Sequence, residues 1–343
     1  MKNARAHVSF ATVRTEGSLL PVDLLQRIVL EDKTLPGLSD DAYYLLGGER
    51  LRDAMNRAWS QLTTVWKNFK SALEKLPESD RANVLTRDKW LLQLFSLLGY
   101  GRLAKASEEQ IDGKTYAISH GYNHSPIHFL GCRTKLDDPQ RDKSGRTITA
   151  HGLVQDYLNR SEKHLWGFVS NGYTLRILRD HHSLTQLAYV EFDLQAMMEG
   201  EHFSEFCLLW LVCHQSRVDA EKLEDAWLEK WFQLAQEEGV RALDKLRHGV
   251  EKAICALGTG FLKHKANKNL QHDLQHGILP KQGYYRLLLR LVYRLIFLFV
   301  AEDRDLLHDT EKTSPDARER YARWYATGRL RALADKRDRK SVV

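Results

Sequence analysis

The chain has 343 residues, of which 43% are hydrophobic and 28% charged, a composition that folds into two or three domains and excludes a disordered protein. The four cysteines lack the paired short spacing of a disulfide framework or a zinc site, so we expect reduced thiols. Residues 1–10 are polar and mixed, so we expect no signal peptide. The longest apolar stretch, 287–301, contains two arginines and is shorter than the roughly 20 residues of a membrane span. These features predict a cytoplasmic protein without membrane contact.

The net charge of +6 is concentrated in one segment. From Lys312 to Val343 there are ten Lys/Arg and four Asp/Glu, and the 41 basic and 41 acidic groups of the remaining chain cancel. A basic tail suits nucleic acid, whose phosphates attract cations. An ordinary solvated amphipathic helix explains the same composition equally well. We expect the charges of this tail to play no part in holding a core together.

Residues 1–80 are predicted to form a helical segment. Apolar side chains recur at three- and four-residue steps from Leu45 through Trp59 and Trp66 to Leu73, which is typical of a buried helical stripe.

Residues 81–217 show mixed periodicity and predict an α/β domain. Asn171-Gly172 is a strong hairpin signal because both residues tolerate positive φ. The expected helices are 86–98 and 153–158, and the expected strands are 115–120, 126–132, 165–169, 174–178 and 188–194. Residues 218–343 are predicted to be helical throughout. Gly258-Thr259-Gly260, a lone Gly-x-Gly, is expected to lie between two of these helices.

The order helix, hairpin, helix, hairpin in 86–178 looks like the core of the PD-(D/E)xK nuclease superfamily. In that superfamily a β-hairpin carries an Asp and a Glu-x-Lys pair that bind an activating divalent cation. Here Gly131 and Arg133 stand where a carboxylate and a Lys are expected. We therefore predict an α+β chain with a helical N-terminal segment, a nuclease-like α/β domain with a degenerate active site, and a C-terminal helical domain. No catalytic or metal-binding residue is assigned.

Three segments, LWGFVSNG at 165–172, YVEFDL at 189–194 and above all YYRLLLRLVYRLIFLFVAEDR at 284–304, resemble type IIG-like restriction–modification adenine-specific DNA methyltransferases and their phage-defence relatives. The resemblance runs from about residue 86 to the end. It implies duplex DNA as substrate, S-adenosylmethionine as cofactor of the complete enzyme, base flipping, and a methyltransferase domain in cis or on a separate chain. This sequence lacks the Asn/Asp-Pro-Pro-Tyr/Phe tetrapeptide and a Gly-rich donor turn, so we do not expect it to methylate DNA alone.

Two groups of arginines are candidates for DNA contact. Arg286, Arg290 and Arg294 recur at four-residue steps and share one helix face. The tail adds Arg329, Arg331, Arg337 and Arg339. The alternative for the first group is ion pairing with Glu302, Asp303 or acids of another helix.

The function predicted from the sequence is DNA engagement and scaffolding for an adenine methyltransferase module. Two alternatives stay open. One is a metal-dependent DNA endonuclease with an unrecognised carboxylate set, and the other is a non-catalytic interaction subunit of a defence complex.

Overall fold

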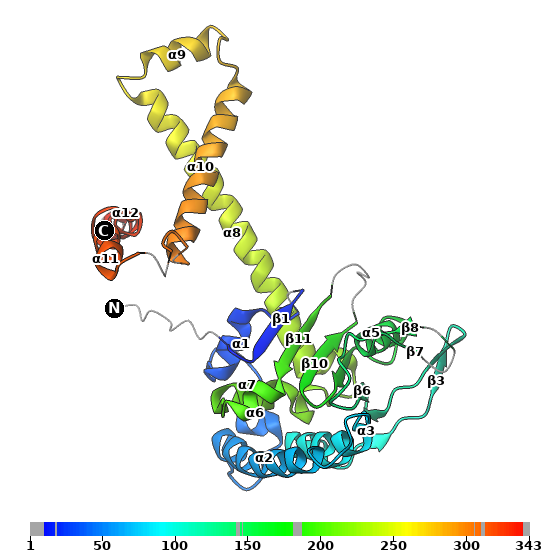
Figure 1. Cartoon of the computed structure of the whole chain (residues 1–343). Coiled ribbons are helices and arrows are strands. Elements are labelled where there is room, and N and C mark those ends of the chain that lie inside the picture. The colour runs from blue at the N-terminus through cyan, green and yellow to red at the C-terminus, as the bar shows by residue number, and fades with distance from the viewer. Residues whose placement is uncertain are drawn as a thin grey trace. The chain divides into compact units, whose positions relative to one another are not determined.

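The computed structural model describes residues 10–17, 19–141, 145, 147–180, 187–304, 306–309 and 313–338, with side chains as far as Ala334 (Figure 1). The chain divides into two compact units, Met1–Glu238 and Gly239–Val343. In the described residues the first unit combines helices with a sheet, and the second is helical.

The strands of the first unit are β1 (Val13–Glu16), β2 (Ala104–Lys105), β3 (Glu109–Ile111), β4 (Lys114–Tyr116), β5 (His120–Tyr122), β6 (Ser125–Phe129), β7 (Gln140–Arg141), β8 (Thr147–Ile148), β9 (Trp166–Ser170), β10 (Thr174–Arg179) and β11 (Tyr189–Asp193). Seven of them form a mixed sheet of order β1-β11-β10-β9-β6-β5-β2. The β6–β9 pair is parallel and its neighbours are antiparallel. Two small ribbons, β3-β4 and β7-β8, are separate from this sheet.

The helices of the first unit cover both faces of the sheet. They are α1 (Val22–Val29), α2 (Leu51–Leu73), α3 (Asn83–Thr86), α4 (Leu92–Phe95), α5 (Ala150–Arg160), α6 (Leu194–Glu199), α7 (Phe203–Cys213) and the start of α8 (Trp227–Lys263), with short turns η1 (Asp40–Tyr43), η2 (Arg87–Leu91), η3 (Ser96–Tyr100), η4 (Gln215–Arg217) and η5 (Leu223–Asp225). Phe168 of β9 joins the larger core, formed with α2, α4 and α7. The next residue, Val169, faces the other side and packs against α5. This alternation is the two-residue period of a strand buried on both faces.

The predicted hairpin across Asn171 and Gly172 is confirmed. The Asn171 side-chain oxygen accepts the backbone N–H groups of Tyr173 at 3.1 Å and Thr174 at 2.8 Å, which closes the turn between β9 and β10. Gly172 has φ +85°, and a Cβ there would lie 2.5 Å from the Thr86 methyl group. Trp90 donates its Nε1–H to the Gly172 carbonyl at 2.6 Å. Only glycine satisfies both the backbone angle and this close approach.

Most other elements expected in 81–217 are present. The helix predicted at 86–98 lies within the run from α3 to η3, the helix at 153–158 lies within α5, and the strands at 126–132 and 188–194 overlap β6 and β11. The strand predicted at 115–120 is wrong as a single element. Its first half belongs to β4 in the small β3-β4 ribbon, and its last residue begins β5 in the main sheet.

The first 80 residues are not purely helical as predicted, because β1 is an edge strand paired with β11. The carboxylate of Glu205 on α7 accepts the backbone N–H groups of Ala11 at 2.8 Å and Thr12 at 2.7 Å and so anchors the residues before β1. The boundary expected after residue 80 does not separate two cores. Trp66 of α2 lies in the same buried cluster as Trp90 and Phe168.

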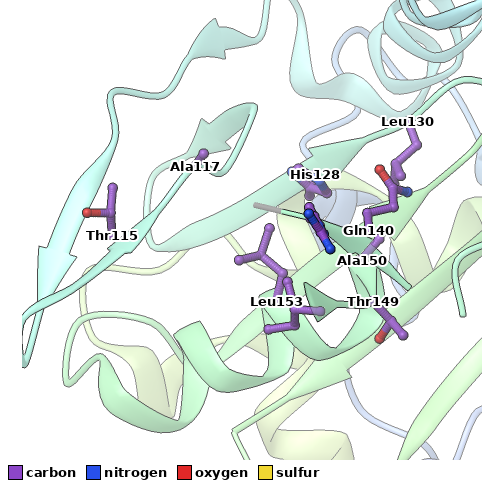
Figure 2. A pocket seen from close by; sticks show the side chains of 10 residues that line it. Thr115, Ala117, His128, Leu130, Gln140, Thr149, Ala150 and Leu153 are labelled. Carbon is purple, nitrogen blue, oxygen red and sulfur yellow. The ribbon is translucent and has the colours of Figure 1, made fainter. Parts of the chain in front are cut away.

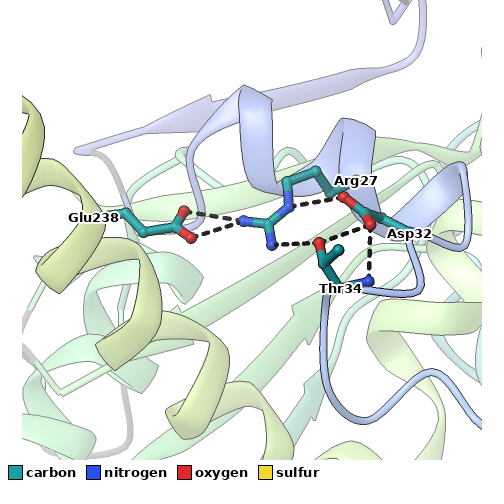
Figure 3. Close-up of polar contacts among 4 residues, drawn as sticks. All are labelled: Arg27, Asp32, Thr34 and Glu238. Carbon is teal, nitrogen blue, oxygen red and sulfur yellow. Dashed lines mark hydrogen bonds and ion pairs between the residues drawn. The ribbon is translucent and has the colours of Figure 1, made fainter.

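The boundary between the two units falls after Glu238, later than the residue 217 expected from the sequence. The reason is that the first turns of α8 are part of the first core. Trp231 is fully buried and donates its Nε1–H to the Pro36 carbonyl at 2.9 Å. Arg27 of α1 then binds Glu238 at 3.0 Å and Asp32 at 3.3 Å, and Asp32 accepts the Thr34 N–H at 2.9 Å (Figure 3).

The second unit contains the remainder of α8 with α9 (Lys268–Gln275), α10 (Lys281–Asp303), α11 (Pro315–Trp324) and α12 (Gly328–Asp338). Gly258 and Gly260 lie inside α8, so the expected interruption there is wrong. Gly258 instead permits close packing: its carbonyl accepts the Tyr284 hydroxyl at 2.9 Å, and a Cβ would lie 2.9 Å from a Leu288 methyl group. None of the described helices combines the length and apolarity needed to cross a membrane.

Candidate nucleic-acid interface

The three arginines predicted on one face of α10 do share an exposed face. Arg286, Arg290 and Arg294 all have exposed side chains. At about 100° per residue, their four-residue spacing places them within about 80° of one another around the helix. Among the described residues, none of the three has a hydrogen-bond or ion-pair partner. Their charges are therefore available to a ligand.

Two exposed aromatic rings lie near this arginine face. Tyr293 and Phe297, which are 60% and 74% exposed, project from the same part of the α10 surface. The opposite side of the helix carries the buried Leu288 and Val292. A face that combines guanidinium groups with exposed rings suits nucleic acid, because guanidinium binds phosphate and aromatic rings stack on unpaired bases.

The alternative of ion pairing with Glu302 or Asp303 is not what the structure shows, since both acids are engaged elsewhere. Glu302 accepts the Tyr321 hydroxyl at 2.7 Å and the Thr327 N–H at 2.9 Å. Although burial works to raise the pKa of Glu302, these hydrogen bonds from Thr327 and Tyr321 lower it overall. Asp303 binds Arg331 at 2.8 and 3.0 Å, and this hydrogen-bonded pairing lowers the pKa of Asp303.

The tail arginines are not equivalent. Arg329 is exposed, whereas Arg331 is half-buried and attaches α12 to the end of α10 through Asp303. Arg331 pairs with an acid of another helix, but this ion pair is largely exposed, so the expectation that the tail charges play no part in holding a core together stays a prediction. The Arg337 side chain and all of Arg339 lie outside the described residues. DNA contact by these four stays a prediction.

A second basic surface, in the first unit, was missed from the sequence. A groove of about 770 Å³ lies beside η2, η3 and β2. Its ionisable lining residues are Arg87, Asp88, Arg102, Lys105 and His120. Hydrogen bonds from Arg87 lower the pKa of Asp88, and Lys105 and His120 add to this effect. Burial, followed by the charges of Arg87 and Lys105, lowers the pKa of His120, so that imidazole is neutral at pH 7.

The position expected for a nuclease carboxylate cannot hold one. The Gly131 N–H donates to the Asn83 side chain at 2.7 Å, and a Cβ at Gly131 would collide with the Arg81 carbonyl oxygen. Arg133 donates to the backbone carbonyls of Leu76, Pro77 and Asp80 and therefore has a structural role.

The acids nearest the β5–β6 hairpin, Asp112 and Asp137, do not form a metal site either, because each is paired with an arginine. Asp112 pairs with Arg160 at 3.2 Å, and Asp137 pairs with Arg176 at 2.6 Å. Across the part of the chain that the structure describes, no group of three His, Cys, Asp or Glu residues is arranged to hold a metal ion.

Comparison with known proteins identifies no relative of this chain. No known protein family matches the chain, and no curated protein or solved structure matches it either. The resemblance of the three segments to adenine methyltransferases therefore stays an expectation from the sequence.

Proposed function

We propose that this chain is the DNA-engaging and scaffolding portion of an adenine-specific DNA methyltransferase of a restriction–modification or phage-defence system. The exposed face of α10 is the observation that carries the proposal. Arg286, Arg290 and Arg294 have no competing partner among the described residues and stand beside Tyr293 and Phe297. This helix is also the longest of the segments that resemble the methyltransferase family.

Apolar rows on the second unit support the scaffolding role. Val240, Leu243 and Leu246 of α8 are 58%, 67% and 54% exposed and recur at three-residue steps along the helix. Trp324 of α11 and Leu330 of α12 are equally exposed. Contiguous exposed apolar side chains mark interaction surfaces. The partner in this proposal is the methyltransferase module that binds S-adenosylmethionine, in cis or as a separate chain. The same rows also favour the alternative of an interaction subunit without DNA contact.

The arrangement of the first unit supports a nuclease-like fold without nuclease chemistry. The β5–β6 hairpin follows the helical run from α3 to η3, α5 crosses over, and β9 returns parallel to β6. The carboxylates that would bind an activating cation are not present at the hairpin. In this proposal the domain contributes a scaffold and basic surface rather than DNA cleavage.

The test is the salt dependence of binding to duplex DNA, measured by fluorescence anisotropy between roughly 50 and 200 mM salt. Each phosphate contact contributes about −0.9 to the slope of log affinity against log salt. The triple variant R286A/R290A/R294A should flatten that slope by about 2 to 3 units. Binding should remain nearly independent of sequence, because phosphate contacts position a protein without reading bases.

A matched control removes the same charge from another surface. R50A/K67A/K75A changes three exposed cations of the first unit that belong to neither α10 nor the basic groove. It should leave the slope within about one unit of the original. An equal effect of the two triple variants, or no effect of the α10 variant, would show that α10 does not contact DNA and would favour the interaction-subunit alternative.

A further inference from the structure

A cavity of about 200 Å³ opens between β6, the β7-β8 ribbon, the β3-β4 ribbon and the start of α5. Figure 2 shows His128 at its centre, with Gln140 and Leu130 on one side, and Leu153 of α5 and Thr149, the residue before α5, below. All of these elements belong to the first unit. The cavity shares no lining residue with the basic groove of the same unit.

Two polar atoms in its wall have no partner. The Nδ1 atom of His128 and the Nε2 atom of Gln140 are shielded from solvent and make no hydrogen bond to any described residue. Burial lowers the pKa of His128 to about 4, so the ring is neutral at pH 7 and offers one donor and one acceptor. Folded proteins leave few buried polar atoms unpaired. Both side chains line the cavity although neither unpaired atom is exposed to it, so a small rotation of each side chain would present these atoms to a polar group of a ligand.

The electrostatic environment of the cavity favours a ligand that carries hydrogen-bond acceptors or negative charge. None of its lining residues is acidic, and Arg141 on β7 is exposed at the edge. Thr149 and Ala150, the N-cap and first residue of α5, form part of the wall. The N-terminal end of an eleven-residue helix adds partial positive charge to the same side.

The other walls are aliphatic and set the size of the ligand. Leu130, Ile148 and Leu153 provide flat apolar contacts, and Ala117 and Ala150 complete the lining. A cavity of about 150 Å³ accommodates benzene, which has six heavy atoms. At about 200 Å³, this cavity has room for a six-membered ring together with its exocyclic atoms. The cavity is open on one side, so a bicyclic purine would extend out of it and bury less of its surface than a pyrimidine.

We propose that this cavity binds the pyrimidine base of a nucleotide, with the ring between the aliphatic side chains, its polar edge against His128 and Gln140, and its phosphate at Arg141. Pyrimidines present carbonyl acceptors together with either a donor or an acceptor at the neighbouring positions. A glutamine amide can turn to match either pattern. The nucleotide is either free or extruded from a DNA duplex, since extruded bases are held in pockets of this kind. The proposal does not depend on DNA contact by α10.

The first measurement is calorimetric titration of the intact chain with dCMP, dTMP, dAMP and dGMP. The two pyrimidine nucleotides should bind and the purine nucleotides should bind at least tenfold more weakly. Gln140→Leu, which keeps the side-chain size but removes the amide, should weaken pyrimidine binding by roughly tenfold. Ala117→Leu fills the cavity and should abolish it. Arg141→Gln should weaken binding, whereas the matched exposed strand variant Arg14→Gln should not.

The second measurement identifies the source of the base. A fluorescent cytosine analogue in a DNA duplex should brighten on binding of the original chain but not of the Ala117→Leu variant if the base is extruded. Nucleotide binding without brightening assigns the cavity to free nucleotides. Thermal unfolding of each variant establishes that it is folded. The proposal is overturned if folded Ala117→Leu binds nucleotides as the original does, if purines and pyrimidines bind alike, or if neither nucleotides nor DNA engage the cavity.

Discussion

Replacing Arg176 with methionine should lower the free energy of unfolding of the first unit by about 3 kcal/mol at pH 7. The Arg176 side chain on β10 is 8% exposed and lies at the centre of a charged network. Its Nη atoms donate to both Asp137 carboxylate oxygens at 2.6 and 2.7 Å, and its Nε donates to Glu191 of β11 at 2.6 Å. The guanidinium also lies 4.5 Å from the centre of the Tyr189 ring.

The magnitude follows from how much of each partner is exposed. Glu191 is 15% exposed, so loss of Arg176 would leave a largely buried carboxylate without its cation, a change that costs about 3 to 5 kcal/mol. Asp137 is 61% exposed and regains water when its partner is lost, which adds little. The lower end of the range is therefore expected. Methionine keeps much of the apolar volume of arginine and creates no large cavity.

Urea unfolding followed by tryptophan fluorescence measures the effect. The double variant R176M/E191M should be more stable than R176M, because a buried ion pair replaced by apolar side chains costs little. R160M removes an exposed arginine that pairs with Asp156 at 3.0 Å and should lower stability far less than R176M, because solvent screens exposed ion pairs. A loss below about 1 kcal/mol for R176M, or a double variant that is less stable than the single, would refute the reasoning.

Three further predictions concern pH, a glycine and the tail. Hydrogen bonds from Arg176 lower the pKa of Asp137, so this stabilisation is present above the ordinary carboxyl pKa and is lost as pH falls through the lowered value; acid titration of stability should be shallower in R176M. Gly172→Ala should lower stability by about 2 to 4 kcal/mol because φ is +85° and the Thr86 methyl group is close, whereas Gly48→Ala, with φ +78° and open space, should cost about 1 to 2 kcal/mol; equal losses in urea unfolding would contradict this. Changing Arg329, Arg331, Arg337 and Arg339 to alanine should flatten the DNA salt slope by roughly 2 to 4 units, and circular dichroism will show whether loss of the Arg331–Asp303 pair also loosens α12; an unchanged slope would assign the tail to domain docking.

Local signals in the sequence were sufficient for part of the fold. The Asn171-Gly172 turn and the apolar stripe of α2 both depend on residues within a few positions of one another, and both are confirmed. The edge strand β1 gave no such signal. Its four residues are too few for an alternating pattern, and its position depends on pairing with β11 far along the chain.

The same distinction between local signals and contacts made only by folding applies to the candidate site. The arginine row of α10 could be predicted because helical spacing alone places the three side chains on one face. The basic groove could not, since Arg87 and His120 are brought to it by the fold of the chain between them. The unpaired atoms of His128 and Gln140 were equally invisible, because burial and missing partners are properties of the packed structure.

The exposed face of α10 places a physical constraint on whatever covers it. A helix that is apolar on most of its sides is normally buried, yet Phe297 and Tyr293 remain largely exposed. An apolar protein surface laid over them would also bury Arg286, Arg290 and Arg294, and each buried guanidinium without an anion carries a penalty of several kcal/mol. The covering surface must therefore supply several negative charges at intervals along the helix together with flat apolar groups. A nucleic acid presents phosphates and bases in that combination, whereas a protein would need a row of carboxylates matched to the arginines. For this reason the face of α10, rather than the basic tail, in which Arg331 is already paired with Asp303 of α10, is where DNA contact is most strongly expected.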